Sequence, residues 1–202
     1  MEAEPLIKRL HARQNHQPPL SVFDVDRAAY DCPLCIVISG MGLQAAEKTM
    51  QCVFDHYTPD LVINCGIAGS LSGCFKPGTI LAVSETGLAT GETNGAAINW
   101  LANHTFEGDQ YSAVRLVSVD KPLFDGERKN RLQPHAQLVD MEAAVIARVC
   151  FEHQTPCKIL KIVSDDAENR QLLLDNLHPF SEQLAAHIYP KINHWIDQRC
   201  PV

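Results

Sequence analysis

The sequence predicts an α/β fold in which a central mixed sheet lies between two layers of helices, as a three-layer sandwich. Two observations predict it. Short apolar runs rich in Val and Ile end in Gly or Ser, and longer stretches with helical spacing lie between them. Strands that alternate with helices along a chain favour a sheet covered by helices.

Four apolar runs are predicted to be strands. They are LCIVISG (34–40), DLVINCG (60–66), TILAVS (79–84) and CKILKIVS (157–164). Because apolar residues in them are continuous and do not alternate with polar ones, we expect strands that are covered on both faces.

Three stretches are predicted to be helices. In LQAAEKTMQCVFDHY (43–57) one stripe is formed by Ala45, Ala46, Thr49, Met50 and Val53. The second, DMEAAVIARVCFEH (140–153), is apolar nearly all round, as in a buried helix. The third, SEQLAAHIYPKINHWIDQ (181–198), contains Pro190, which we expect to kink it.

Composition limits the domain count and the class of partner. With 202 residues, of which 46% are apolar, residues 1–202 are expected to form a single domain. The formal charge of -7 disfavours nucleic acid and anionic membrane surfaces as partners. No apolar run approaches the roughly 20 residues that span a bilayer, and the N-terminal MEAEPLIKRL is unlike a signal peptide. We therefore expect a cytoplasmic protein.

The eight cysteines are scattered through apolar segments, which favours buried, reduced thiols over disulfides. Cys32 and Cys35 in CPLC have the spacing of zinc ligands. No second pair or histidine cluster completes a four-ligand site, so we expect no metal and no other cofactor.

Ligands of sheets flanked by helices collect at the carboxyl ends of the strands, and four segments stand at such ends. In SGMG, the residues Ser39, Gly40, Met41 and Gly42 precede a helix whose first amides can donate to an oxygen-rich group. In NCGIAGS, Gly66 and the small residues after it let a ligand or a neighbouring backbone approach. Tight structural turns explain both segments equally well.

The third segment, VDME, places two carboxylates at the start of a helix. Asp140 is suited to cap the helix, and Glu142 is expected in its first turn. Glu142 lies roughly 80–120 degrees away from the polar stripe of Arg148 and Glu152, which points it away from open solvent. A ligand contact, with the two oxygens accepting from adjacent ribose hydroxyls, is therefore preferred to simple capping.

In the fourth segment, VSDD, a buried strand delivers Ser164 and Asp165 to its end. A carboxylic acid in a desolvated place can hold a proton near neutral pH and give it to a leaving group. From spacing alone, a turn or capping role for Asp165 is the simpler interpretation.

Together the four segments resemble the nucleoside phosphorylase superfamily of the purine and uridine type. They are most similar to its nucleosidase branch, typified by 5'-methylthioadenosine/S-adenosylhomocysteine nucleosidase. The matching segments are SGMGLQAAEKT, PDLVINCGIAGSLSGCFKPGTILAVS, VDMEAAVIARVC and LKIVSDDAEN, between Ser39 and Asn169.

The resemblance implies roles for particular residues. The aspartate that protonates the purine falls on Asp165, with Ser164 beside it. The pair that binds the ribose falls on Met141 and Glu142. An arginine of the family is replaced here by Lys161, which keeps the charge but loses the bidentate fork.

The implied reaction is cleavage of an N-glycosidic bond through a ribosyl cation. The ribose and nucleophile loop falls on residues 39–42, and the carboxylate that orients the attacking water falls on Glu2 or Glu4. Phosphorolytic members hold phosphate with arginines, whereas this chain has Asn64 at one such place and no arginine before Arg9. Hydrolysis is therefore preferred to phosphorolysis.

The substrate implied is a purine nucleoside, adenine-type or a thio-nucleoside. A phosphate-dependent phosphorylase and a catalytically weak nucleoside-binding protein are the alternatives. The resemblance also implies a homodimer.

Overall fold

The computed structural model describes residues 2–26, 28, 30, 32–91, 98–104, 114–167 and 170–198. Most of the strands form one sheet of seven, in the order β5-β10-β4-β9-β8-β6-β7. They are β4 (Val62–Ser70), β5 (Ile80–Ala82), β6 (Glu85–Ala89), β7 (Trp100–Ala102), β8 (Arg115–Val119), β9 (Leu138–Asp140) and β10 (Cys157–Asp165).

The sheet is mixed. Strand β4 runs parallel to β10, and β8 runs parallel to both β6 and β9. Antiparallel pairs join β5 to β10, β4 to β9 and β6 to β7. The longest pairing, between β4 and β10, starts at Cys157 opposite Val62 and carries both strands to one edge of the sheet.

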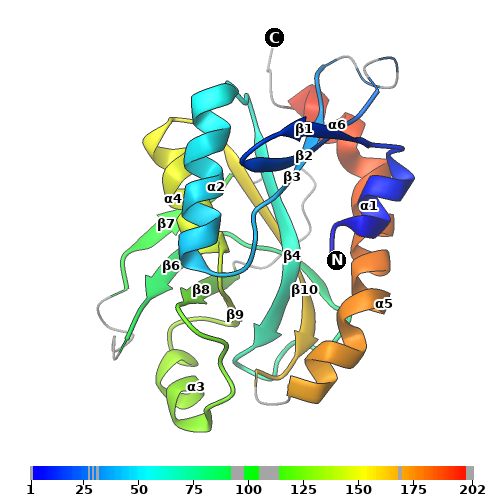
Figure 1. Cartoon of the computed structure of the whole chain (residues 1–202). Coiled ribbons are helices and arrows are strands. Elements are labelled where there is room, and N and C mark those ends of the chain that lie inside the picture. The colour runs from blue at the N-terminus through cyan, green and yellow to red at the C-terminus, as the bar shows by residue number, and fades with distance from the viewer. Residues whose placement is uncertain are drawn as a thin grey trace.

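Helices cover both faces of this sheet (Figure 1). On one face α2 (Leu43–His56) packs against α4 (Ala143–Glu152), and on the other α5 (Arg170–Ile188) lies over β10 and β4. The short α1 (Glu4–Arg9) packs on α5. After α5, a 3-10 turn at Tyr189–Lys191 leads into α6 (Ile192–Gln198), so the predicted kink at Pro190 is confirmed. The predicted α/β class with a mixed central sheet between helices is also confirmed.

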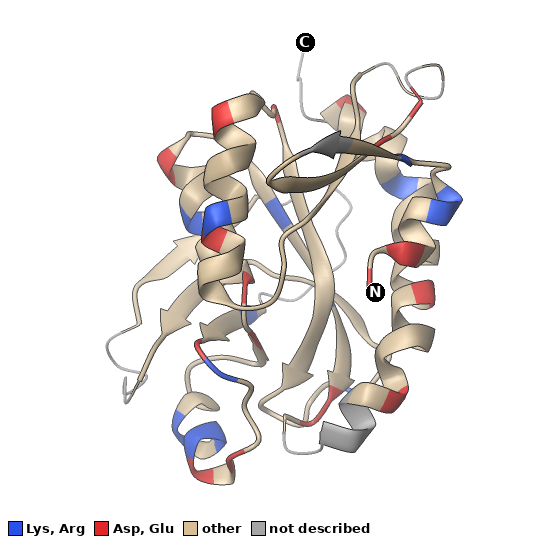
Figure 2. Cartoon of the chain, viewed as in Figure 1, with Lys and Arg blue, Asp and Glu red and all other residues tan. Residues whose placement is uncertain are grey.

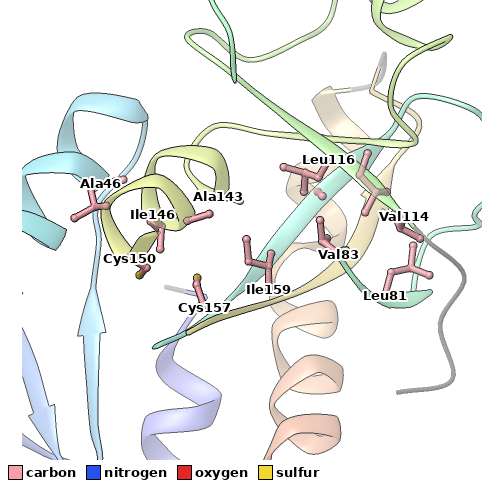
Figure 3. Packing of buried hydrophobic residues seen from close by; sticks show 14 of the residues in the cluster. Ala46, Leu81, Val83, Val114, Leu116, Ala143, Ile146, Cys150, Cys157 and Ile159 are labelled. Carbon is pink, nitrogen blue, oxygen red and sulfur yellow. The ribbon is translucent and has the colours of Figure 1, made fainter. Parts of the chain in front are cut away.

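Strand β10 shows why its sequence is continuously apolar. Ile159 packs in the core under α4, while Leu160 and Ile162 pack in the core under α5, because successive side chains of a strand point to opposite faces. Figure 3 shows the first core, where Ile146 and Cys150 of α4 face the strands. Covering on both faces is thus confirmed for this run.

The run predicted at 34–40 behaves differently. It forms β3 (Cys35–Ile38), which belongs to a separate antiparallel sheet with β1 (Arg13–Gln17) and β2 (Leu20–Asp24). All four side chains of β3 are only half-buried, so the expectation of a strand covered on both faces was wrong here. The sequence pattern does not identify the partner of a short apolar strand, and β3 pairs with β2 only.

The charges and thiols are distributed as follows. Figure 2 shows Lys and Arg interspersed with Asp and Glu on the helices rather than gathered into one basic face of this view. The cysteines of the described residues carry free thiols.

No helix in the described part of the chain is long and apolar enough to cross a membrane.

Candidate active site

The four segments that stand at strand ends meet around one cavity of about 1680 Å³. Its lining includes Ser39, Gly40 and Met41 after β3, and residues 66–69 of β4. Residues 140–142 between β9 and α4, and 164–165 at the end of β10, complete this part of the wall. Residues far apart in sequence are therefore brought together as the strand-end rule predicts.

Asp165 occupies the end of β10, where the pairing with β4 is interrupted by a bulge between Val163 and Asp165. Bulges of this kind redirect a side chain at the end of a strand. The carboxyl is buried, with 4% of the residue exposed. The Ser164 hydroxyl donates to Oδ2 of Asp165 at 2.5 Å, and the N–H of Ala167 donates to Oδ1 at 2.6 Å. One carboxyl is thus held from two sides in the cavity wall.

Glu142 precedes α4 rather than lying in its first turn, because its backbone has φ -137° and helical geometry begins at Ala143. Its Oε1 accepts from the N–H of Gly42 at 2.6 Å. Gly42 itself has φ +88°, a conformation that favours glycine, and it opens α2. The half-buried Glu142 therefore connects two strand-end segments and lines the cavity, beside Met141.

The N-cap position of α4 is Glu142, and Asp140 caps the helix through its side chain, since its carboxylate accepts from the N–H of Ala143 at 3.0 Å. Its other partners were not visible in the sequence. The Ser118 hydroxyl donates to Oδ1, and Lys161 Nζ lies 2.8 Å from Oδ2. Ser118 also accepts from the N–H of Ala144 at 2.8 Å. Lys161, which stands in the place of the family's arginine, is 3% exposed and paired with Asp140 in the cavity wall.

The structure separates the two N-terminal glutamates. Glu2 lines the cavity, accepts a hydrogen bond from the backbone of Ile67, and has Oε2 within 3.4 Å of the point where a Cβ on Gly66 would lie. Lys161 Nζ lies 3.5 Å from that same point. Glu4 instead begins α1 and pairs with Lys8 at 2.8 Å, with half of its side chain exposed. Glu4 is not among the residues that line the cavity.

A structural turn was one of the two interpretations of the segment that contains Gly66, but the structure continues β4 through this segment to Ser70. Its missing Cβ leaves room for Glu2 and Lys161. Gly69 plays the same part near Asp165, whose Oδ1 would lie 3.3 Å from an added Cβ. Gly66 and Gly69 are about 10 Å apart along a strand, which is the scale of a nucleoside.

Burial and charge set the protonation of the cluster. Burial raises the pKa of Glu2, and the Lys161 ammonium opposes this. Burial, followed by the charge of Asp140, raises the pKa of Glu142. Burial alone would lower the pKa of Lys161, but Asp140, Glu142 and Glu2 outweigh it and raise that pKa overall. Lys161 therefore stays a cation that favours ionised carboxylates around it.

Exposed apolar side chains surround the cavity mouth. Met41 is 81% exposed, Leu174 is 54% exposed and Phe124 is 38% exposed, and all three line the cavity. Phe124 and Leu174 do not belong to any of the periodic patterns described above. These side chains offer an apolar contact to whatever lies at the entrance.

A model of one protein family matches residues 2–189, and its description is "Phosphorylase superfamily". The match covers most of the chain, including all of the strand-end segments described above. The chain belongs to the phosphorylase superfamily. The last two residues of the matching segment LKIVSDDAEN, 168–169, lie outside the described residues.

Named relatives agree with this membership. The chain is 27% identical over 187 residues to a 5'-methylthioadenosine/S-adenosylhomocysteine nucleosidase of Buchnera aphidicola, covering 80% of this chain and 81% of that one. Futalosine hydrolase of Helicobacter pylori has the same fold, with a TM-score of 0.84, 17% identity, and coverage of 96% and 93%. A Helicobacter pylori nucleosidase mutant with 5'-methylthioadenosine in its active site is similar at a TM-score of 0.81, 17% identity, and coverage of 96% and 94%. These two structures show that the chain shares their fold.

Proposed function

We propose that this superfamily member is a nucleosidase, which hydrolyses the N-glycosidic bond of a purine nucleoside, adenine-type or a thio-nucleoside. The observation that carries the proposal is the separation of its acids along β4. The carboxylate of Asp165 lies beside Gly69, and the carboxylate of Glu2 lies beside Gly66. Glu142 also lines the cavity, from the segment before α4. This spacing suits an acid at the base and carboxylates at the sugar.

Each group has a role in this proposal. Asp165, held by Ser164, protonates the purine so that the base leaves neutral. Glu142, oriented by the amide of Gly42, accepts from the ribose hydroxyls, and Met141 packs beside the sugar. Glu2 orients the attacking water, and the carboxylates favour the positive charge that develops on the ribosyl group.

The loop of Ser39, Gly40 and Met41 provides the remaining contact to the sugar. Lys161 acts on Glu2 and Asp140 through its charge, so its contribution to substrate binding in this proposal is indirect. No metal or organic cofactor is part of the proposed reaction.

The charges of the cavity support water over phosphate as the acceptor. Among the described lining residues, the basic side chains are Lys161 and His56, and no arginine is present. Lys161 is already paired with Asp140, and Arg9 pairs with Glu182 away from the lining. Acidic side chains outnumber the basic ones in the lining, and four of them, Glu2, Asp140, Glu142 and Asp165, lie at the strand-end site. Such a surface repels an anionic acceptor.

We include a homodimer in the proposal, because the apolar side chains of Met41, Phe124 and Leu174 are exposed at the cavity mouth. Small-angle scattering of the full chain tests this part separately. A monomer at micromolar concentration would contradict it.

The experiment that tests the function is release of free base from methylthioadenosine, adenosine, inosine and futalosine, with uridine as a control, in the presence and absence of phosphate. The proposal predicts base release without phosphate and a free sugar product. Strict dependence on phosphate, with a sugar phosphate as product, would favour the phosphorylase. Binding without base release would favour a nucleoside-binding protein that lacks turnover.

A further inference from the structure

Ser118 of β8 carries a fully buried hydroxyl that lies outside the cavity. The residue is 0% exposed, and it is not among the described residues that line the cavity. In the parallel register of β8 and β9 it stands directly opposite Asp140. Because paired residues of neighbouring strands point to the same face of a sheet, the Ser118 hydroxyl meets the Asp140 carboxyl from outside the candidate active site.

The two hydrogen bonds of the Ser118 hydroxyl have a fixed direction. The N–H of Ala144 can only donate, so the serine oxygen accepts from it, at 2.8 Å. Asp140 is ion-paired with Lys161, and an ionised carboxylate can only accept. The single proton of the hydroxyl therefore goes to Oδ1 of Asp140, and the two oxygens are 2.5 Å apart. The hydroxyl is thus held by both of its partners.

The two oxygens of Asp140 have different partners. Oδ1 accepts from Ser118 and, at 3.3 Å each, from the N–H groups of Glu142 and Ala143. Oδ2 accepts from the N–H of Ala143 at 3.0 Å and lies 2.8 Å from Lys161 Nζ. The contact with Ser118 is the shortest of these. It holds Oδ1 toward β8 and so leaves Oδ2 directed at Lys161.

The place of the Lys161 ammonium depends on this carboxylate. A lysine carries a compact charge on a flexible stem, without the rigid fork of an arginine, so its partner determines where the charge lies. In this position Nζ lies 3.5 Å from the point where a Cβ on Gly66 would lie, and Oε2 of Glu2 lies 3.4 Å from the same point. Asp140 therefore places the ammonium near the carboxylate of Glu2, on which its charge acts.

Glu142 has direct contacts of its own that do not include Ser118. Its Oε1 accepts from the N–H of Gly42 at 2.6 Å, and its N–H donates to Asp140. Loss of the Ser118 hydroxyl leaves both groups of partners present. Its effect is therefore expected on the Lys161 side of Asp140 rather than on the side of Glu142.

We propose that Ser118 is a positioning residue of the active site, which acts through Asp140 to hold the Lys161 ammonium beside Glu2. The proposal rests on the function proposed above, in which Glu2 orients the attacking water. A hydroxyl outside the cavity then affects the rate of base release more than the binding of the nucleoside.

The first test compares Ser118→Ala with Ser118→Thr, which keeps the hydroxyl. Thr86→Val is the matched control, because Thr86 is another buried strand hydroxyl outside the cavity lining and bonds Asn103. Ser118→Ala is expected to lower kcat for base release by roughly tenfold to a hundredfold, with KM changed by less than about threefold. Ser118→Thr and Thr86→Val should keep kcat within about threefold, even where they lower the melting temperature. Equal losses of kcat in Ser118→Ala and Ser118→Thr would overturn the proposal.

Asp140→Asn tests whether Ser118 acts through the carboxylate. Asparagine keeps one acceptor oxygen but has no charge with which to hold the Lys161 ammonium. In this background Ser118→Ala is expected to lower kcat further by no more than about twofold, because residues that act as a unit are not additive. An equally large loss in both backgrounds would overturn the proposal.

The position of the ammonium is also measured without turnover. The ¹⁵N-detected ammonium signal of Lys161, assigned by its loss in Lys161→Arg, reports how fast its protons exchange with water. Ser118→Ala is expected to speed this exchange at least about tenfold, since a hydrogen bond to a charged group is lost, whereas Ser118→Thr and Thr86→Val should not. This response in a protein that releases no base would support the positioning and contradict the proposed function alone. Unchanged exchange in Ser118→Ala would overturn the positioning whether or not base is released.

Discussion

Two glutamates that are two residues apart in the sequence have different surroundings in the structure. Glu2 is in the cavity beside Gly66, while Glu4 is exposed and paired with Lys8. Glu2→Gln is expected to lower the rate of base release by about a hundredfold or more, because water loses its orienting carboxylate. Glu4→Gln is the matched control and should change the rate by no more than about twofold, since exposed ion pairs contribute little. Steady-state rates at pH 7 distinguish the two, and equal losses would contradict the role of Glu2.

Lys161 is expected to act through the charge that it presents to Glu2. Its ammonium opposes the effect of burial on the pKa of Glu2, so Lys161→Met should raise that pKa further. The acidic limb of kcat/KM should then move to higher pH, whereas Lys161→Arg should leave it near its original place. The measurement is the pH profile of base release for both variants.

Lys161→Met also leaves Asp140 buried without its ion-pair partner, which can cost about 3–5 kcal/mol of stability. The double variant Lys161→Met/Asp140→Asn removes both charges and serves as the control for folding. An unchanged acidic limb in a folded variant that lacks the Lys161 charge would contradict the electrostatic role.

Glu142 gives a prediction about stability and pH. Its pKa is raised in the folded protein, chiefly by burial, so the folded state holds the proton more tightly than the unfolded chain. The stability associated with this group is fully present below the unfolded pKa and is lost as pH rises through the folded one. Glu142→Gln does not have this loss. The melting temperature of the variant minus that of the original protein should therefore be larger at pH 8 than at pH 4. Thermal melts across this range test it, and a constant difference would contradict it.

At the scale of elements, the sequence predicts those strands whose neighbours cover both faces. The run of β10 is recognisable because each of its faces meets a helix layer. β6 and β8 were missed because they contain Thr86 and Ser118, which look polar but are buried. Thr86 bonds Asn103 and Ser118 bonds Asp140, and such distant partners leave no periodic signal in the sequence.

The same limit applies to the candidate site. The segments that compose it were predictable, because strand ends gather at one edge of a sheet. The choice of Glu2 over Glu4 and the pairing of Lys161 with Asp140 were not, since both depend on which strands become neighbours. Gly66 stands opposite Lys161 in the register of β4 and β10.

The junction of β4 with the end of β10 gives a prediction at this scale. A Cβ on Gly69 would lie 3.0 Å from that of Ala167 and 3.3 Å from Oδ1 of Asp165. Gly69→Ala is therefore expected to cost about 1–3 kcal/mol of stability and to slow base release by displacing Asp165. At Gly126 in α3 (Gly126–Leu132), an added Cβ would meet nothing within 4 Å. Gly126→Ala should be neutral or stabilise by about 0.4–1 kcal/mol, and denaturant unfolding of both variants measures this. Equal stabilities would contradict the tight packing at Gly69.

At the scale of the whole molecule, the sheet order determines where the chemistry is located. Segments from residues 39–42, 66–69, 140–142 and 164–165 share one wall because β4 lies between β10 and β9. The separate sheet of β1, β2 and β3 leads, at the end of β3, into Ser39 and Gly40, which belong to that wall. Fold membership and site geometry therefore support the same proposal, that of a superfamily member that breaks a glycosidic bond.

The most direct measurement is adenine release from methylthioadenosine in phosphate-free buffer, comparing the original protein with Asp165→Asn. Asparagine keeps the size of the side chain but cannot donate the proton of a carboxylic acid. The proposed mechanism predicts turnover by the original protein and a loss of about a hundredfold to ten-thousandfold in the variant, with nucleoside binding retained. Equal rates for the two proteins, or no release by the original protein despite binding, would contradict it.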